Sequence, residues 1–331
     1  MVFKTLNIDM SNYNLYKSLG LIQVIINMNT IQLGKAFHLS ILKNHDRPII
    51  TNADLYSILL KLYHDQAYDG IRIGKITKKR PDIQTYNSKI RALKASGIIT
   101  PLTGAKSYLI SGREKPSAEQ VGCYLYPYSY LCYLSAMDYH GITDRIPKSV
   151  HLMTPPSQVS TSLLAKQYPD NWKNENTHEK IRNIKMSSKF ERKDFIYHTN
   201  KNFNVYKEIS NSGGLRVSPL GRTFLDMFKT PKYCGGFDHV LDILEGSGLR
   251  YLKLILNEFS KYGSNIDKSR LGFILENVLE IRDPLLDEWA LSAQRGSSRV
   301  LVPGKEFSPY YSQKWCISIN QESLQRYGTR N

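Results

Sequence analysis

Residues 77–110 read TKKRPDIQTYNSKIRALKASGIITPLTGAKSYLI, and this stretch decides the fold of the N-terminal part of the chain. From Ile83 to Leu93 apolar residues recur at helical spacing, and Gly97 ends the pattern. Two strand-like pieces, separated by a proline and a glycine, complete the stretch up to Ile110. The stretch therefore predicts a helix followed by a short β-hairpin.

Two further helices are expected before this stretch. Apolar residues recur at near-helical spacing over 30–44, and a second apolar stripe covers 53–63, behind the N-cap residue Asn52. Three helices followed by a hairpin is the element order of a winged helix, a common DNA-binding fold. The predicted fold class is therefore α+β: a winged helix-turn-helix domain at 30–112, followed by a mixed α/β domain.

The remaining segments are assigned from composition and periodicity. Residues 1–29 form an N-terminal extension, and either Met1 or Met28 fits as the native start. The polar run SGREKPSAEQ predicts a linker at 113–120, so the second domain covers 121–331. In that domain the patterns predict helices at 128–140, 219–228, 237–244, 249–259 and 268–279, and strands at 149–153, around 197–217 and within 299–319.

The charge of the chain points to a polyanionic partner. There are 45 Lys and Arg against 29 Asp and Glu, a net charge of +16. Residues 1–117 carry 17 of these cations and 7 of the anions, a net of +10, which leaves +6 for the other 214 residues. Nucleic acid is the first candidate partner and an anionic membrane surface the second, and the N-terminal third is the expected contact.

Other composition features exclude several classes of protein. The four cysteines are scattered, with no C-x-x-C pair and no histidine at ligand spacing, which argues against a zinc site. Neither a secretion signal nor an apolar run long enough to span a membrane is found, since the run at 19–28 is too short. We expect a soluble cytoplasmic protein with reduced thiols, no metal and no cofactor.

A helical wheel divides the helix after Asp82 into two faces. The apolar face is expected to consist of Ile83, Tyr86, Ile90 and Leu93, and the opposite face presents Gln84, Thr85, Ser88 and Arg91. Gln pairs with adenine and Arg with guanine through two hydrogen bonds each, while Thr and Ser contact bases or phosphates. This second face is the predicted reader of the major groove.

Basic residues around the helix are the predicted phosphate contacts. They are Lys78, Lys79 and Arg80 before the helix, Lys89 and Lys94 on its flanks, and Lys106 in the hairpin, placed as a wing-tip residue would be. Three alternatives remain for this surface: an ordinary solvated helix face, an RNA contact, or a winged helix that docks another protein.

The second half of the chain resembles a known family. Residues 128–147, YSYLCYLSAMDYHGITDRIP, are similar to the region of the AbiEi antitoxins in which a helix with Ser-Ala is followed by His-Gly, an apolar residue, Asp and Pro, and then by a strand. Residues 217–236 are similar to the family's helix ending in Leu-Asp, followed by Pro-x-Tyr-x-Gly-Gly. Weaker matches at 270–276 and 315–320 follow in order.

This resemblance implies a function. AbiEi proteins are antitoxins of type IV toxin–antitoxin systems that act in phage abortive infection, with an N-terminal winged helix and a C-terminal antitoxin domain. They repress their own operon at inverted repeats in double-stranded DNA, and they neutralise a nucleotidyltransferase-like toxin without necessarily touching it. This chain departs from the family in its longer N-terminal part and at Cys132-Tyr133, where the usual acidic residue is replaced.

Chemistry-bearing residues of the second half are interpreted first as structure. His140-Gly141 fits a helix C-terminus, and Asp144 and Asp226 fit caps or ion pairs better than an acid/base pair, so no catalytic residue is assigned. The basic stretch 166–193, which includes Trp172 and Phe190, fits either a second nucleic-acid contact or a solvated loop.

Two rival functions remain beside the autoregulating antitoxin. One is a stand-alone winged-helix regulator of a mobile element or defence locus. The other is an enzyme targeted to nucleic acid, although no carboxylate cluster, phosphate-binding glycine loop or nucleophile motif supports an enzyme. Inverted repeats require two DNA-reading heads, and either a monomer or a dimer on DNA satisfies this requirement.

Overall fold

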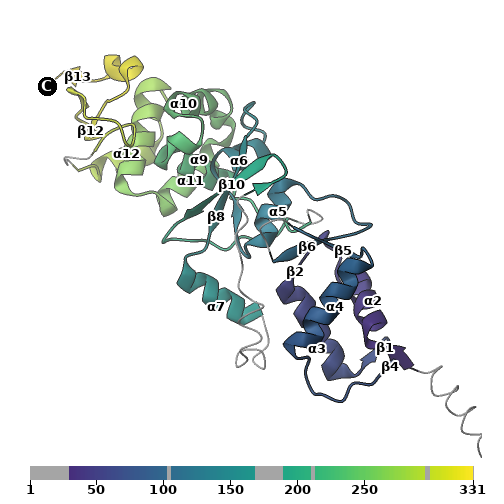
Figure 1. Cartoon of the computed structure of the whole chain (residues 1–331). Coiled ribbons are helices and arrows are strands. Elements are labelled where there is room, and N and C mark those ends of the chain that lie inside the picture. Colours follow the sequence, from purple (N-terminus) through teal and green to yellow (C-terminus); the bar gives the residue numbers. More distant parts are fainter. Residues whose placement is uncertain (1–29, 103–105, 168–188, 210–212, 295–298, 331) are drawn as a thin grey trace, which may run out of the picture. The chain divides into compact units, whose positions relative to one another are not determined.

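The computed structural model describes residues 30–102, 106–167, 189–209, 213–294 and 299–330. These residues form two compact units, divided in the sequence between Lys115 and Pro116, inside the stretch 113–120 expected to be a linker (Figure 1). Both units combine helices with small sheets, so the fold class is α+β. The extension 1–29 and most of the basic stretch 166–193 lie outside the described residues.

The first unit contains three helices and two three-stranded sheets among its described residues. Its elements are β1 (Thr30–Gln32), α2 (Leu33–Asn44), β2 (Ile49–Thr51), α3 (Asn52–Asp65), β3 (Ala67–Tyr68), β4 (Ile71–Gly74), α4 (Ile83–Ala95), β5 (Ile99–Pro101) and β6 (Ser107–Ile110). In one sheet the order is β2-β6-β5, with both pairs antiparallel. The helices at the three expected places and the hairpin β5–β6 are confirmed.

Two features of the first unit differ from the expectation. The N-cap of α3 is Thr51 rather than Asn52: Thr51 Oγ1 accepts from the Asp54 amide at 3.1 Å, and Asp54 Oδ2 accepts from the Thr51 amide at 3.0 Å. This capping box satisfies two amides at once, whereas Asn52 is already the first helical residue. The second sheet, β1-β4-β3, was not expected, because its strands are short and β1 pairs with the distant β4.

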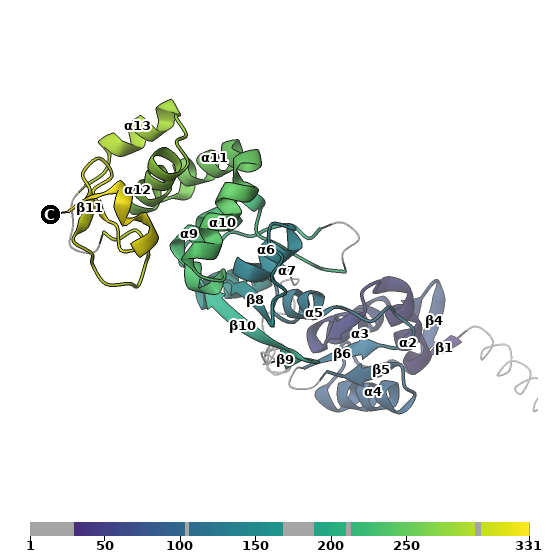
Figure 2. The same cartoon turned by 90° about the horizontal axis from the view of Figure 1, so that it is seen from above.

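The second unit combines a four-stranded sheet, a group of helices and, near the end of the chain, the three-stranded sheet β12-β11-β13. Its elements are α5 (Ala118–Leu125), β7 (Tyr130–Leu131), α6 (Tyr133–Tyr139), β8 (Ser149–Thr154), α7 (Ser157–Gln167), β9 (Lys189–Phe190), β10 (Lys193–Thr199), α9 (Leu220–Lys229), η2 (Pro231–Tyr233), α10 (Phe237–Gly246), η3 (Gly248–Tyr251), α11 (Leu252–Tyr262), α12 (Asn265–Phe273), η4 (Ile274–Val278), α13 (Pro284–Leu291), β11 (Tyr310–Ser312), β12 (Ile317–Ser318), η5 (Glu322–Tyr327) and β13 (Thr329–Arg330). The sheet order is β7-β8-β10-β9, with β8 and β10 parallel, and α9 contacts both α6 and α10 (Figure 2).

The helix expected at 128–140 is wrong in its first third. Tyr128 has a φ angle of 67°, which an α-helix does not allow, and the two residues of β7 pair with β8 instead. Only α6 is helical, and it ends at the expected place with Gly141 at a φ of 63°. The expected strand residues 203–206 form no strand, because the rings of Phe203 and Tyr206 pack on Tyr130.

The segments that carry the family resemblance contact one another in the second unit. His140 Nε2 donates to the Ser218 carbonyl at 2.7 Å, and Arg145 Nη1 donates to the Gly235 carbonyl at 2.8 Å. Trp315 Nε1 donates to Glu276 Oε2 at 2.9 Å, which joins the other two segments. These residues therefore act as structural links, as their sequence context suggested.

A pair of histidines lies on the central strands of the second unit. His151 Nδ1 and His198 Nε2 are 3.0 Å apart, and the rings of Tyr133 and Tyr233 lie 4.7 and 4.6 Å from that of His198. Burial, the neighbouring His151 and the cation of Lys232 lower the pKa of His198 to about 4. The folded protein therefore resists protonation at this position.

The lowered pKa of His198 predicts that the folded protein loses stability in acid. Because the pKa of His198 is lower in the folded chain than in the unfolded chain, its contribution is complete above about pH 6.5 and is lost as the pH falls toward 4. Between about pH 7 and about pH 5, the unfolding free energy of wild type should fall by about 1–2 kcal/mol relative to that of His198→Gln. This range allows for the partial solvent exposure of His198. Urea titrations at both pH values measure this, with the exposed His64→Gln as control; an equal difference at both pH values would contradict it.

Candidate nucleic-acid interface

Helix α4 starts at a strong cap. The Asp82 carboxylate accepts from the Thr85 amide at 2.7 Å and pairs with Lys78 Nζ at 2.6 Å. The Lys78 ammonium and these hydrogen bonds hold the pKa of Asp82 well below its usual range. Asp82 therefore stays ionised and fixes the first turn, where a negative charge favours the helix dipole.

The buried side of α4 is anchored by a tyrosine. The Tyr86 hydroxyl donates to Asn52, with its oxygen 3.0 Å from Oδ1, and the ring meets that of Tyr56 edge-on at 5.7 Å. Ile90 and Leu93 are buried beside it, as expected. Ile83, which was expected on this face, is 36% exposed, because it begins the helix at the margin of the apolar face. These contacts join α4 to α3 and direct the opposite face of α4 toward solvent.

The outer face of α4 presents polar side chains to solvent. Gln84, Ser88 and Arg91 are exposed along one side of the helix, as expected from the wheel. Among the residues that the structure describes, none makes a hydrogen bond or ion pair with these three side chains. Their donors and acceptors are therefore available to an external partner.

Thr85 lies differently from the other three expected readers. Its side chain is half-buried, and its hydroxyl hydrogen-bonds with Asp82 and Tyr63. These contacts tie Thr85 to the helix start, which leaves its methyl group and not its hydroxyl for an external contact.

Asn87 is an exposed residue of this surface that the wheel did not select. It follows Gln84 by three positions and precedes Arg91 by four, so the three share a continuous surface on the helix. The same ridge continues to Lys94, whose ammonium lies 5.0 Å from the centre of the Tyr108 ring in β6. Asn87 therefore lies toward the hairpin side of α4. Its spacing from Gln84 and Arg91 in the sequence could have identified it as part of this surface.

The six expected phosphate contacts have different surroundings. Lys79, Arg80 and Lys106 are exposed, and Lys106 lies where the hairpin begins its second strand, next to residues 103–105 outside the described part. Lys78 is exposed but paired with Asp82. Lys89 is half-buried and lies near Gly34 of α2, and Lys94 covers Tyr108. Of the three cations that precede the helix, Lys79 therefore has the fewest described contacts.

Metal ligands, catalytic acids and membrane-spanning helices are the other features of the described chain that bear on function. The described residues hold no group of three or more His, Cys, Asp or Glu side chains that fits a metal ion. Asp226 pairs with Arg222 at 2.9 Å, whereas Asp144 is exposed. Within the described ranges, no helix has the length and apolar character to cross a membrane.

Comparisons with known proteins give weak structural similarity and no sequence match. No family model matches the chain, and no curated protein matches it significantly. Among solved structures, the chain is similar to the crystal structure of the RV2827C protein from Mycobacterium tuberculosis, with 11% sequence identity and a TM-score of 0.43. The similarity covers 86% of this chain and 90% of that chain. A similarity at this level carries no argument about function.

Proposed function

We propose that the protein binds double-stranded DNA, with residues 30–112 as a winged helix and α4 as its recognition helix. The observation that carries the proposal is the outer face of α4, on which Gln84, Asn87, Ser88 and Arg91 are exposed without described partners. The helix is anchored on α3 through Tyr86 and is followed by the hairpin β5–β6, an arrangement that suits a major-groove reader.

The proposed roles follow from side-chain chemistry. Arg91 is expected to read guanine, and Gln84 and Asn87 are expected to read adenine, each through two hydrogen bonds. Lys79, Arg80 and Lys106 neutralise phosphates and set the register of the helix in the groove. The positive charge of residues 1–117 favours this partner over an acidic protein, because it accompanies a polar face with base-reading chemistry.

The biological purpose that we propose is autoregulation by an antitoxin. The resemblance of 128–147 and 217–236 to the AbiEi antitoxins supports it. In this proposal the protein represses its own operon at inverted repeats and counteracts a nucleotidyltransferase-like toxin.

A footprint on the DNA upstream of the gene tests the proposal. We expect protection of an inverted repeat, with an affinity that falls steeply as salt rises because each neutralised phosphate releases counterions. Scrambling the repeat while keeping its composition is the matched control and should abolish the footprint. Absence of any protected site there would contradict autoregulation, and co-expression with the neighbouring reading frame separately tests protection from a toxin.

A further inference from the structure

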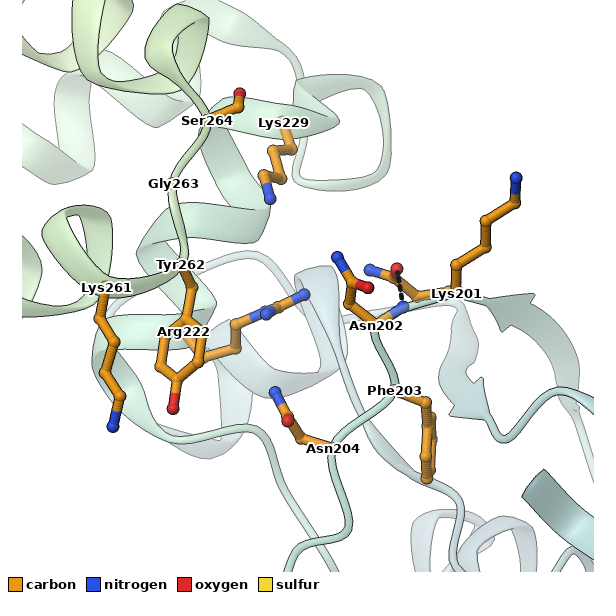
Figure 3. A pocket seen from close by; sticks show the side chains of 11 residues that line it. Lys201, Asn202, Phe203, Asn204, Arg222, Lys229, Lys261, Tyr262, Gly263 and Ser264 are labelled. Carbon is orange, nitrogen blue, oxygen red and sulfur yellow. Dashed lines mark hydrogen bonds between the residues drawn. The ribbon is translucent and has the colours of Figure 1, made fainter.

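A polar cavity lies within the second unit. Its residues belong to segments other than those of the proposed DNA surface. It has a volume of 530 Å³ and is lined by the loop 200–204 after β10, by α9 and by the junction 261–264 between α11 and α12 (Figure 3). None of its lining residues is acidic, and four carry a positive charge. Such a lining favours an anionic occupant.

Arg222 forms the inner wall of this cavity. Its side chain is 3% exposed, and its Nε donates to Asp226 Oδ1 at 2.9 Å. Among the described residues no hydrogen bond is formed by its two terminal NH₂ groups, and Figure 3 shows the guanidinium extending from the Tyr262 side of the cavity toward Asn202. The free terminal groups of Arg222 therefore face the cavity, where they can donate to an acceptor that a ligand brings.

A second cation and two amides face the same space. Figure 3 shows the ammonium of Lys229 directed toward it from the other end of α9, and the amides of Asn202 and Asn204 at its edge. Lys229 Nζ forms an ion pair with Asp267 Oδ2 at 3.6 Å, a distance longer than a hydrogen bond, so its N–H groups can still donate to a ligand. The carboxylates of Asp226 and Glu258 interact with Arg222, and that of Asp267 interacts with Lys229, so the four cations of the lining remain in excess over these three anions.

We propose that this cavity binds the terminal phosphate of a small phosphorylated ligand. A guanidinium offers two parallel donors that match two phosphate oxygens, and an ammonium satisfies a third. The burial of Arg222 favours one source of phosphate: a terminal phosphate can enter the cavity and reach a side chain that is 3% exposed, whereas the backbone of a duplex contacts cations on an exposed surface. The half-exposed ring of Tyr262 adds apolar surface for the organic part of the ligand.

Calorimetric titration of the full chain with inorganic phosphate and with AMP tests the proposal. We expect AMP to bind, adenosine not to bind, and Lys229→Gln to weaken AMP roughly tenfold, the effect of losing one charge-assisted hydrogen bond. Lys253→Gln removes the same charge from α11 outside the cavity and should change the affinity less than about twofold.

Three outcomes would overturn the proposal. One is no heat from phosphate or AMP at about 1 mM ligand, and another is an equal loss of AMP affinity in Lys229→Gln and Lys253→Gln. The third is binding of a duplex that depends on Lys229 while AMP does not bind, which would identify a nucleic-acid backbone as the phosphate source. Arg222→Lys is a second variant; circular dichroism checks its fold, since it disturbs the buried pair with Asp226.

Discussion

Arg91→Ala is expected to remove base discrimination at one position of each DNA half-site. Arg91 is exposed at the middle of the outer face of α4 and has no described partner, so its guanidinium can form two hydrogen bonds with guanine. Losing them should cost about 1–3 kcal/mol on the preferred sequence and almost nothing on sequences with another base there. The measurement is a set of binding titrations on the protected site and on its single-base variants.

Lys79→Ala is the matched control for a cation that contacts phosphate only. We expect it to weaken all sequences by a similar factor and to reduce the salt slope by about 1. Arg91→Ala should leave that slope nearly unchanged if its contact is to a base. If Arg91→Ala instead weakened every sequence equally and lowered the slope, Arg91 would contact phosphate and the proposed role would be wrong.

The periodicity of α4 was enough to predict most of this surface. Gln84, Ser88 and Arg91 lie opposite Tyr86, Ile90 and Leu93 because residues of a straight helix follow a fixed angle of rotation. A helical wheel carries no information about neighbouring elements. The residues that differ from the expectation do so because of contacts with such elements or with the start of the helix. Thr85 is turned inward by Asp82 and Tyr63, and Lys89 is half-buried near α2.

The second unit was less predictable because its geometry depends on distant partners. Tyr130 and Leu131 continue a helical pattern in the sequence, but β8 and Arg216 provide backbone hydrogen bonds that hold them as a strand. Cavity residues such as Arg222 and Lys229 are seven positions apart on α9, yet the loop 200–204 that completes the cavity lies about twenty residues earlier in the sequence. The local periodicity of a sequence does not show which separate segments come together to form one cavity.

Gly272→Ala is expected to destabilise the second unit by about 3 kcal/mol. Gly272 lies in α12 against Trp315, which is fully buried, and an added Cβ would lie within 3.0 Å of three carbons of the six-membered indole ring. The indole cannot move away easily because its Nε1 donates to Glu276, whose other oxygen pairs with Lys314 and Arg282. Overpacking against such a fixed ring costs at the upper end of the usual 1–3 kcal/mol. Urea unfolding followed by tryptophan fluorescence measures the loss.

Two comparisons separate this steric effect from a general effect of glycine. Gly246→Ala in α10 adds a methyl group where no atom lies within 4 Å, so it should be neutral or stabilise by about 0.5–1 kcal/mol through helix propensity. Trp315→Phe removes the far edge of the indole that the new methyl group would meet. The double variant Gly272→Ala, Trp315→Phe should therefore be more stable than the sum of the single effects predicts, by about 1–2 kcal/mol. Strict additivity would mean that Gly272 is required for its backbone rather than for the space it leaves to Trp315.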